Sequence, residues 1–474
     1  MIWTIAKKEL LILWRNKTFL LAGLIFFSLL AISAISGYNS YLQQQEERLQ
    51  AEQETKEQWL KQDPKHPHIA AHFGHFAFLP RTVLSIFDVG LDPFTGTTIY
   101  LEPHRQNDFA FKPAEFRNTS LRFGQFSMAL ALQVLLPVII IFIAFDSFSG
   151  ERKGGTLKQL YSQGLSFRQL FAGKFIAYGI ISLTMLLPAM LLVLSIQALF
   201  LKALPIGFIA RISTLSLLYF IYLLLFVGTA LLVSALCKES KSSILVLLTV
   251  WICNTVLIPK WAANAGDNLY PLPTKYDFAQ QIKADIAKGV NGHDPSNARA
   301  EQLKKQLLAK YKVDQVSELP FNYEGYLMQA GEEYSSRVYD KHFAQLENTL
   351  DKQNRISLWC SILDPFLAVK GLSASLSGTD YYTHLDFQKQ AERYRREFVQ
   401  FMNRNMQDHS KLGDWTYKID HTVYEGTPSF SYKKPSISQS TRPYLLGLGS
   451  LLIYSLLIVV SVSILNRKAL QHAQ

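Results

Sequence analysis

The stretch SMALALQVLLPVIIIFIAFDSFSGERKGGTLKQL, Ser127–Leu160, joins a long apolar run to a charged turn that carries two glycines. Its first part, Ser127–Phe148, has the length that an α-helix needs to cross a bilayer, about 20 residues. The whole chain has 474 residues but a mean hydropathy of only +0.09, because long polar stretches separate such runs. The pattern predicts an α-helical polytopic membrane protein instead of two or three soluble domains.

Six apolar runs predict six transmembrane helices. The fifth is the shortest. Pro137 and Pro188 fall inside the second and third, which membrane helices tolerate when neighbours satisfy the freed backbone groups. The first run is longer than the apolar region of a signal peptide, which favours a span over a cleaved signal. The predicted spans are residues 18–36, 127–148, 173–200, 212–236, 243–258 and 444–465.

The distribution of charge predicts the orientation of these spans. The flanks on one side carry thirteen Lys and Arg against three Asp and Glu, which is +10 of the net charge of +11. Positive flanks stay in the cytoplasm, so we expect both termini inside. The basic balance then reflects topology and attraction to anionic lipid, and it does not indicate nucleic-acid binding. These flanks are Met1–Lys17, Ser149–Lys174, Cys237–Ser242 and Asn466–Gln474, the last being the cytoplasmic tail.

The two outer stretches, residues 37–126 and 259–443, make up more than half of the chain. Both leave the same membrane face, so we expect one large, mainly helical α+β ectodomain. Tyr38–Gln62 predicts a helix that continues the first span. Pro64–Pro113 predicts a compact, partly β element with a strand at Thr97–Leu101.

The second outer stretch predicts long helices with one β segment. Alternation at Trp415–Ile419 predicts a strand. Of three cysteines only Cys360 faces the outer, oxidising side, so no disulfide framework is expected and Cys360 should be a buried free thiol. The runs with little glycine and no proline predict helices at residues 297–311, 323–356 and 384–406.

Residues 1–17 predict an amphipathic helix. It would lie in the plane of the membrane interface, with its tryptophans among the lipid headgroups. The alternative is a plain cytoplasmic extension of the first span. The residues expected on its apolar face are Ile2, Trp3, Ala6, Leu10, Leu13 and Trp14.

Histidines gather in the first outer stretch. If Ile69–Phe76 is helical, His68, His72 and His75 share one face at i, i+4 and i+7. Neutral imidazoles placed in this way can bind zinc or copper. The alternative is that they pack in a polar, aromatic core, because phenylalanines are interleaved and Pro67 and Gly74 disfavour a regular helix. The candidate ligands are His66, His68, His72, His75 and His104.

A second candidate motif in the ectodomain is Gly378-Thr379-Asp380, which precedes a predicted helix. Thr379 and Asp380 are typical helix-capping residues. Contact with a substrate or a partner is the functional alternative.

The cytoplasmic loop, residues 149–172, predicts a short amphipathic helix. Leu157 and Leu160 recur at helical spacing after the charged turn, and Gly164–Ser166 forms a second turn. An apolar helix face can dock into a partner's groove, with Glu151 and its neighbours setting orientation at the rim. An ordinary charged loop that obeys the positive-inside rule is the alternative.

One set of loop residues matches a known pattern: Glu151-Arg152, Gly155-Thr156-Leu157, Leu160, Ser166, Arg168 and Gly173-Lys174. This set resembles the intracellular loop of ABC-2-type permeases, which holds the coupling helix that contacts the ATPase subunit. The resemblance implies a fold like that of type V exporters, with residues 1–17 as the connecting helix. The implied ATPase-coupling residues are Glu151, Arg152, Gly155, Thr156, Leu157 and Leu160.

Longer ectodomain stretches narrow the resemblance. The first outer stretch is similar to the first ectodomain stretch of one sub-family of ABC-2 permeases. The similar segments are HPHIAAHFGHFAFLP at His66–Pro80, FDVG at Phe87–Gly90, TGTTIYLEPHRQN at Thr95–Asn107 and KPAEF at Lys112–Phe116. That sub-family has large periplasmic ectodomains still carried as a domain of unknown function. SLSGTDYYTHLDFQKQAERYRREFVQFMN at Ser375–Asn403 is similar to its second ectodomain stretch.

The resemblance implies a permease subunit of an ATP-driven transporter, an exporter, in a bacterial inner membrane. The implied partners are two ABC ATPase subunits that bind ATP and Mg²⁺, and a second permease subunit that is identical or a similar paralogue. Membrane lipid and a periplasmic partner that binds the ectodomain are the other implied partners. The chain itself would hold no cofactor, apart from zinc or copper on its histidines.

Motifs for catalysis are missing from the sequence. Gly150–Thr156 has the glycine interval of a phosphate-binding loop, but no Lys follows its last glycine, and neither HExxH nor GxSxG occurs. We therefore expect no enzyme, and a membrane-anchored periplasmic enzyme is disfavoured. Two other functions stay open. The complex could transmit ATP-driven motion and remodel a periplasmic partner, or the ectodomain could deliver metal.

Overall fold

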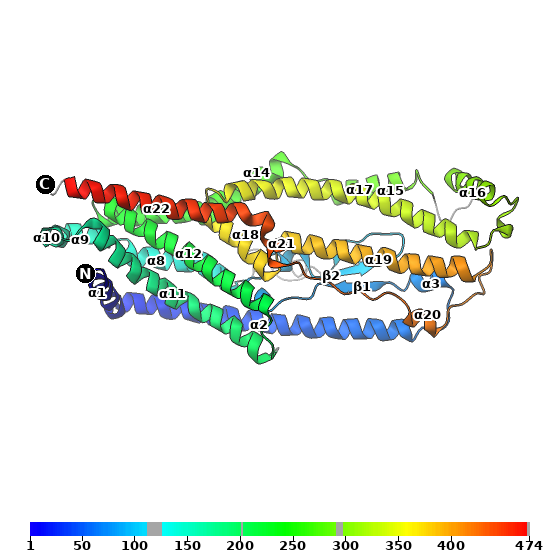
Figure 1. The fold of residues 1–474 in the computed structure, drawn as a ribbon, viewed down its shortest axis with the longest axis horizontal. Coiled ribbons are helices and arrows are strands. Elements are labelled where there is room, and N and C mark those ends of the chain that lie inside the picture. Colours follow the sequence, from blue (N-terminus) through cyan, green and yellow to red (C-terminus); the bar gives the residue numbers. More distant parts are fainter. Residues whose placement is uncertain (111–125, 201, 291–296, 472–474) are drawn as a thin grey trace.

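The computed structural model describes residues 1–110, 126–200, 202–290 and 297–471; the predicted KPAEF motif lies outside them. The molecule is long and mainly helical. Both ends of the chain lie at one end of it, and the ectodomain helices lie at the other (Figure 1). Within these described residues, six helices are long and apolar enough to cross a membrane, which confirms the predicted number. They are Lys17–Leu60, Met128–Lys153, Phe167–Leu199, Ile206–Leu236, Ser240–Leu269 and Ile437–Asn466.

The first span is part of a much longer helix. Asn16 separates α1 (Ile2–Arg15) from α2 (Lys17–Leu60), and its side chain caps α2 by accepting hydrogen bonds from the N–H groups of Thr18 and Phe19. The 44 residues of α2 measure about 66 Å at 1.5 Å per residue, about twice the thickness of the hydrocarbon core. One rigid element therefore joins the membrane to the ectodomain, as predicted (Figure 1).

α1 is helical, as predicted, and one of its faces packs against the rest of the chain. Ala6, Glu9 and Leu13 are buried, whereas Trp3 and Trp14 are exposed. A buried carboxylate on an apolar face needs a partner. That partner is a lysine of the third span.

The second and fifth spans each contain a π-helical turn directly before a proline. Pro137 and Pro259 lack an N–H and press on the carbonyl four residues earlier, so the wider turn relieves that contact. The carbonyl displaced by Pro137 belongs to Gln133, and it accepts a hydrogen bond from the Tyr222 hydroxyl at 2.8 Å. These spans comprise α7 (Met128–Leu130), η2 (Ala131–Leu135) and α8 (Leu136–Ala144), and α13 (Ser240–Ile252), η3 (Cys253–Leu257) and α14 (Ile258–Leu269).

Two short helices form the connection between the second and third spans, which was predicted to be a cytoplasmic loop. The third span begins at Phe167, earlier than predicted, because Ser166 and Gln169 cap its start reciprocally: each side chain accepts a hydrogen bond from the other's N–H. The elements are α9 (Ser149–Lys153), α10 (Thr156–Ser162), α11 (Phe167–Phe200) and α12 (Ile206–Leu236).

The predicted β element is a three-stranded antiparallel sheet in the order β1-β2-β3. β1 is His75–Phe78, β2 is Thr98–Leu101 and β3 is Phe109–Ala110. Phe78 pairs with Thr98, and Ile99 pairs with Phe109. β2 confirms the predicted strand. Three short helices accompany the sheet: α3 (Pro67–Ala71), α4 (Leu84–Phe87) and α5 (Asp92–Thr95).

The second outer stretch is helical, and the predicted strand at Trp415–Ile419 is wrong. Among the residues that the structure describes, its one backbone hydrogen bond to a distant segment joins the N–H of Ile419 to the carbonyl of Lys65, and no described strand continues the pairing. The elements are α15 (Lys275–Ile286), α16 (Ala298–Tyr311), η4 (Val316–Glu318), α17 (Tyr323–Cys360), α18 (Pro365–Ser377), α19 (Tyr381–His409), α20 (His421–Glu425), α21 (Ile437–Thr441), η5 (Arg442–Tyr444) and α22 (Leu445–Gln471).

One core joins both outer stretches of the chain. Trp59, at the far end of α2, packs against Phe398 of α19 and donates a hydrogen bond to the carbonyl of Tyr424 at 3.0 Å. Ile99 of the sheet is buried in the same cluster. A second core lies among the spans and also includes α18. The ectodomain therefore folds against the extension of the first span.

Candidate functional site

The end of the molecule that carries both chain termini is built around the turn between α9 and α10. Gly155 has φ of 75°, a left-handed conformation that favours glycine. The Thr156 hydroxyl donates to the carbonyl of Glu151 at 3.1 Å, which closes the turn. Leu157 is only 6% exposed and packs into the core of the spans, with Leu160 half-buried beside it. The apolar face of α10 is thus already occupied by its own chain.

Glu151 lies in an ion-pair network and does not extend from the rim of the loop. Lys174 of α11 is 1% exposed, and its Nζ lies 3.0 Å from Oε1 of Glu151 and 2.9 Å from Oε1 of Glu9. Lys8 adds a contact of 3.3 Å to Glu151. The two carboxylates are thus balanced by two ammonium groups, the buried one of Lys174 and the half-exposed one of Lys8. The network joins α1, the loop and the third span.

Arg152 fastens the loop to the fourth span. Its guanidinium donates to the carbonyls of Ala235, at 2.6 Å, and Cys237 at the carboxyl end of α12. A cation there satisfies carbonyls that have no partner within the helix and complements the helix dipole. The Ser234 hydroxyl of α12 accepts from the N–H groups of Phe148 and Ser149, at 3.0 and 3.2 Å.

The surface that the loop leaves exposed is polar and basic. Lys153, Lys158, Gln159 and Gln163 are exposed, whereas Glu151 and Leu157 point inward. Of the predicted coupling residues, Arg152, Gly155 and Thr156 are exposed, although their polar contacts are to the chain itself. Any partner would therefore meet lysine and glutamine side chains first.

The motif Gly378-Thr379-Asp380 forms the turn between α18 and α19. Gly378 has φ of 74° and ends α18, and the Asp380 carboxylate caps α19 by accepting from the N–H groups of Tyr382 and Thr383. The Tyr444 hydroxyl donates to the same carboxylate at 2.9 Å. The capping interpretation of this motif agrees with the structure.

This turn also contacts the FDVG stretch of the first outer segment. The Leu91 N–H donates to the Thr379 carbonyl at 2.8 Å, and the Thr379 hydroxyl donates to the Asp88 carbonyl at 3.1 Å. A Cβ on Gly90 would lie 2.3 Å from the Thr379 oxygen, so only glycine fits there. Two motifs thus meet where the ectodomain joins the spans, although Asp88 and Thr379 are 291 residues apart in sequence.

A chain of buried polar groups runs from this joint into the spans. The Ser373 hydroxyl donates to the Asp88 carboxylate at 2.6 Å and lies 2.9 Å from the Tyr219 hydroxyl. Tyr219 in turn accepts from the Gln133 amide at 2.7 Å. Burial raises the pKa of Asp88, and the hydrogen bonds from Ser373 and Gly90 oppose that shift. Fully partnered buried networks of this kind select one arrangement of the helices.

Three charged groups are buried beside the joint. Asp92 lies 2.9 Å from Arg81 Nε and 3.2 Å from His384 Nε2. Burial alone would lower the pKa of His384, but the Asp92 carboxylate and the carbonyl and carboxylate of Asp380 raise it above its ordinary value. His384 therefore retains its proton to a higher pH than an exposed histidine.

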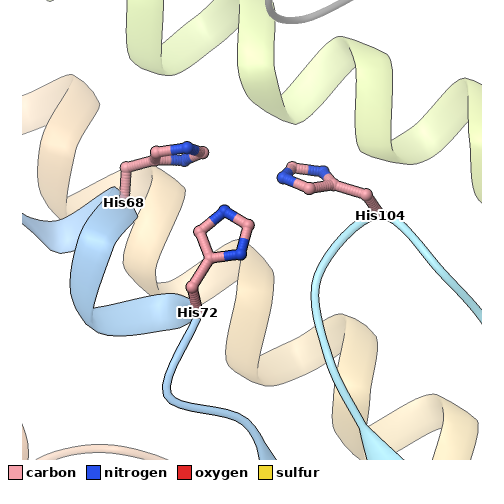
Figure 2. A group of neighbouring side chains, drawn as sticks. All are labelled: His68, His72 and His104. Carbon is pink, nitrogen blue, oxygen red and sulfur yellow. The ribbon is translucent and has the colours of Figure 1, made fainter.

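The histidines divide into two groups. His68, His72 and His104 point toward one another (Figure 2), with one ring nitrogen of each within 4.8 Å of the others. His66 caps α3 and stacks on a tryptophan, and His75 lies on β1 against Phe398. The predicted helix over Ile69–Phe76 ends at Ala71, so His75 does not share a helix face with His68 and His72.

Sequence reasoning missed several of these groups. Glu9 and Lys174 were not predicted as an ion pair, although a charge next to an apolar run is a signal of internal pairing in a membrane protein. Ser373 and Tyr219 carried no signal, because hydroxyls are common in membrane helices.

These features define a class: a multi-pass helical membrane protein with a cytoplasmic-type loop fastened to its spans and a large helical ectodomain. Two family models match separate parts of the chain, and one of them is that of the ABC-2 transporter family. The model described as ABC-2 family transporter protein matches residues 99–260, which include α9 and α10, and the domain of unknown function DUF3526 matches residues 275–433. The family is one of membrane permeases, which is consistent with the lack of a catalytic motif in the sequence.

A curated relative supports the assignment over a short region. The chain is 38% identical over 55 residues to the probable ABC transporter permease protein NosY of Stutzerimonas stutzeri. The matched region is 12% of this chain, and it spans about a fifth, 20%, of the length of that relative.

Proposed function

We propose that this chain is the permease subunit of an ATP-driven transporter and that the α9–α10 loop receives a separate ATPase subunit. The observation that carries the proposal is the division of the loop into two faces. The inner face is fastened to three helices by Glu151, Arg152 and Leu157, and the outer face presents Lys153 and Lys158. A loop that is rigid inside and exposed outside can transmit force from a bound subunit.

The contacts suggest how motion would reach the spans. Displacement of the loop acts on α11 through Lys174 and on the carboxyl end of α12 through Arg152. It also acts on α1 through Glu9 and Lys8. α1 would therefore move with the loop, which is the part expected of a connecting helix at the membrane surface.

The remaining parts of the proposal rest on the family and on charge. Two ATPase subunits would bind ATP and Mg²⁺, and a second permease subunit, identical or paralogous, would complete the complex. The positive-inside rule assigns the loop and both termini to the cytoplasm of a bacterium and the ectodomain to the periplasm. The proposed direction of transport is export, because a large outer domain would lie where an exported substrate leaves the spans.

The test is co-purification of the ATPase from native membranes in mild detergent. Lys158→Glu reverses a charge on the exposed face of α10 and should release the ATPase, whereas Lys305→Glu makes the same reversal on the exposed surface of α16 and should retain it. The membrane fraction and helical content of both variants should match the wild type. An ATPase that never co-purifies, or one retained equally by both variants, would contradict docking at this surface.

One observation favours a second function, transmission of motion to the ectodomain without passage of a substrate. α2 runs unbroken from the first span to Trp59 in the ectodomain core, and α14 continues the fifth span and packs along α17. Spin labels on α2 and α17 would measure the distance between them with and without ATP in the purified complex. ATP-dependent distances combined with no transport would favour transmission, and constant distances would exclude it.

A further inference from the structure

Three imidazoles converge on the surface of the ectodomain, two from one short helix and one from a turn further along the chain. His68 lies on α3, His72 ends that helix, and His104 comes from the turn after β2. The ring centroids are 4.8 Å apart for His68 and His72, 5.2 Å for His72 and His104, and 5.8 Å for His68 and His104. Figure 2 shows the three rings facing a common space in front of α19 and beside α17.

The spacing fits a metal ion with nitrogen ligands. Zinc binds imidazole nitrogen at about 2.0–2.1 Å in a tetrahedral arrangement, which places the ligand nitrogens roughly 3.4 Å apart. The three candidate nitrogens all lie within 4.8 Å of one another. Small side-chain rotations of His72, which is exposed, and of its two neighbours cover the difference.

A buried carboxylate contacts both the ring and the backbone N–H of His104. Glu332 of α17 is 6% exposed, and its Oε1 contacts Nδ1 of His104 and accepts a hydrogen bond from the backbone N–H of His104 at 2.9 Å. With Nδ1 donating to the carboxylate, Nε2 carries the lone pair that a metal needs. Metal-binding histidines typically have such a carboxylate partner, which sets the tautomer and the orientation of the ring.

The backbone of His104 is held in an unusual conformation. Its φ is 64°, in the left-handed region that few non-glycine residues adopt. The double contact with Glu332 holds it there, and Arg395 lies 3.5 Å from the other oxygen of that carboxylate. Strain of this kind gathers at ligand-binding positions because the surrounding contacts must maintain it.

We propose that His68, His72 and His104 bind one transition-metal ion of the Zn²⁺ or Cu²⁺ class, with Glu332 as the positioning residue. Three imidazoles leave at least one coordination position open, as in sites that exchange a ligand and unlike closed structural zinc sites. Imidazole ligands suit zinc and copper and exclude calcium and magnesium, which prefer oxygen. The site needs no ATPase and does not depend on the transporter proposal.

Binding at this site would also clamp the two outer stretches together. His68, His72 and His104 belong to the first stretch, and Glu332 belongs to the second. A metal ion that fixes His104 strengthens its contact with α17. The ectodomain should therefore unfold at a higher temperature with Zn²⁺ bound, because a ligand that binds the folded state stabilises it.

The experiment uses the full-length chain, purified in detergent on a histidine-free affinity tag and stripped with a chelator. Zn²⁺ is titrated in competition with a chromophoric chelator, and bound metal is counted by mass spectrometry. The expected result is one Zn²⁺ per chain. Affinity should fall about 10- to 100-fold in Glu332→Gln and further in His72→Ala. His409→Ala removes an exposed histidine of the same ectodomain and should leave binding unchanged.

A second readout identifies the ligands. Cu²⁺ bound to the wild type should show nitrogen hyperfine structure from three imidazoles in its electron paramagnetic resonance spectrum. His104→Asn should reduce the count to two, and Asn tolerates the left-handed backbone at that position. Binding below one ion per chain, equal affinity in His72→Ala and the wild type, or equal loss in His409→Ala would each overturn the proposal.

Discussion

The sharpest prediction concerns Lys174, because its ammonium group lies between two carboxylates. Replacing it by Met keeps the volume of the side chain and removes the charge. The distances of 2.9 and 3.0 Å from Nζ place the Glu9 and Glu151 oxygens at most about 5.9 Å apart. At that separation two like charges repel by about 3 kcal/mol with an effective dielectric constant of about 20. Lys8 stays 3.5 Å from Glu9 and 3.3 Å from Glu151 and offsets part of this repulsion. With the lost pairing to the buried ammonium, we expect Lys174→Met to be destabilised by about 3 kcal/mol, the low end of the range for a broken buried ion pair.

The assay is equilibrium unfolding in lipid–detergent mixed micelles, followed by far-ultraviolet circular dichroism. Adding Glu9→Gln and Glu151→Gln to Lys174→Met removes the repulsion and should restore most of the loss. Lys7→Met alters an exposed lysine of α1 and should change stability by less than about 0.5 kcal/mol. The reasoning is refuted if Lys174→Met lies within 1 kcal/mol (about the error of such measurements) of the wild type, or if the triple variant is no more stable than the single one.

Three further predictions follow from the ectodomain. The stabilising effect of the His384–Asp92 pair should be complete below the ordinary histidine pKa and lost as the pH rises through the raised folded pKa. The melting temperatures of wild type and His384→Gln should therefore converge as the pH is raised from below the ordinary histidine pKa, and a gap that stays constant with pH would contradict this. Trp59→Ala should cost about 3–5 kcal/mol because it empties a buried site in the shared core; a loss under 1 kcal/mol in denaturant unfolding would show that the core is not shared. Gly90→Ala should loosen the contact with Thr379, detected as faster hydrogen exchange of the Leu91 amide, and unchanged exchange would refute the close packing.

The spans and the long helices could be predicted from the sequence, because each depends on local composition. Apolar runs of about 20 residues must form helices in a bilayer, and Tyr323–Ile356 lacks the glycine and proline spacing of turns. The strand predicted at Trp415–Ile419 failed because a strand needs a partner, and alternation specifies a face without supplying one. The early start of α11 was missed because the Ser166–Gln169 cap lies in a segment assigned to the loop.

The candidate sites were predicted only in part. The sequence identified the loop, the Gly378-Thr379-Asp380 motif and the histidines as unusual. It assigned Glu151 to the rim of a docking surface, whereas Glu151 pairs with Lys174. It grouped His75 with the metal candidates by counting along a helix that ends at Ala71.

By itself, the sequence determined the number of spans, the expected orientation and the helical character of the ectodomain, since hydropathy, charge and turn residues act over neighbouring positions. Only the tertiary structure decided which charged and polar groups meet. Lys174 and Glu9 are 165 positions apart, and Asp88 and Ser373 are 285 apart. No local pattern encodes such pairs, because a buried charge requires a partner but does not specify where along the chain that partner lies.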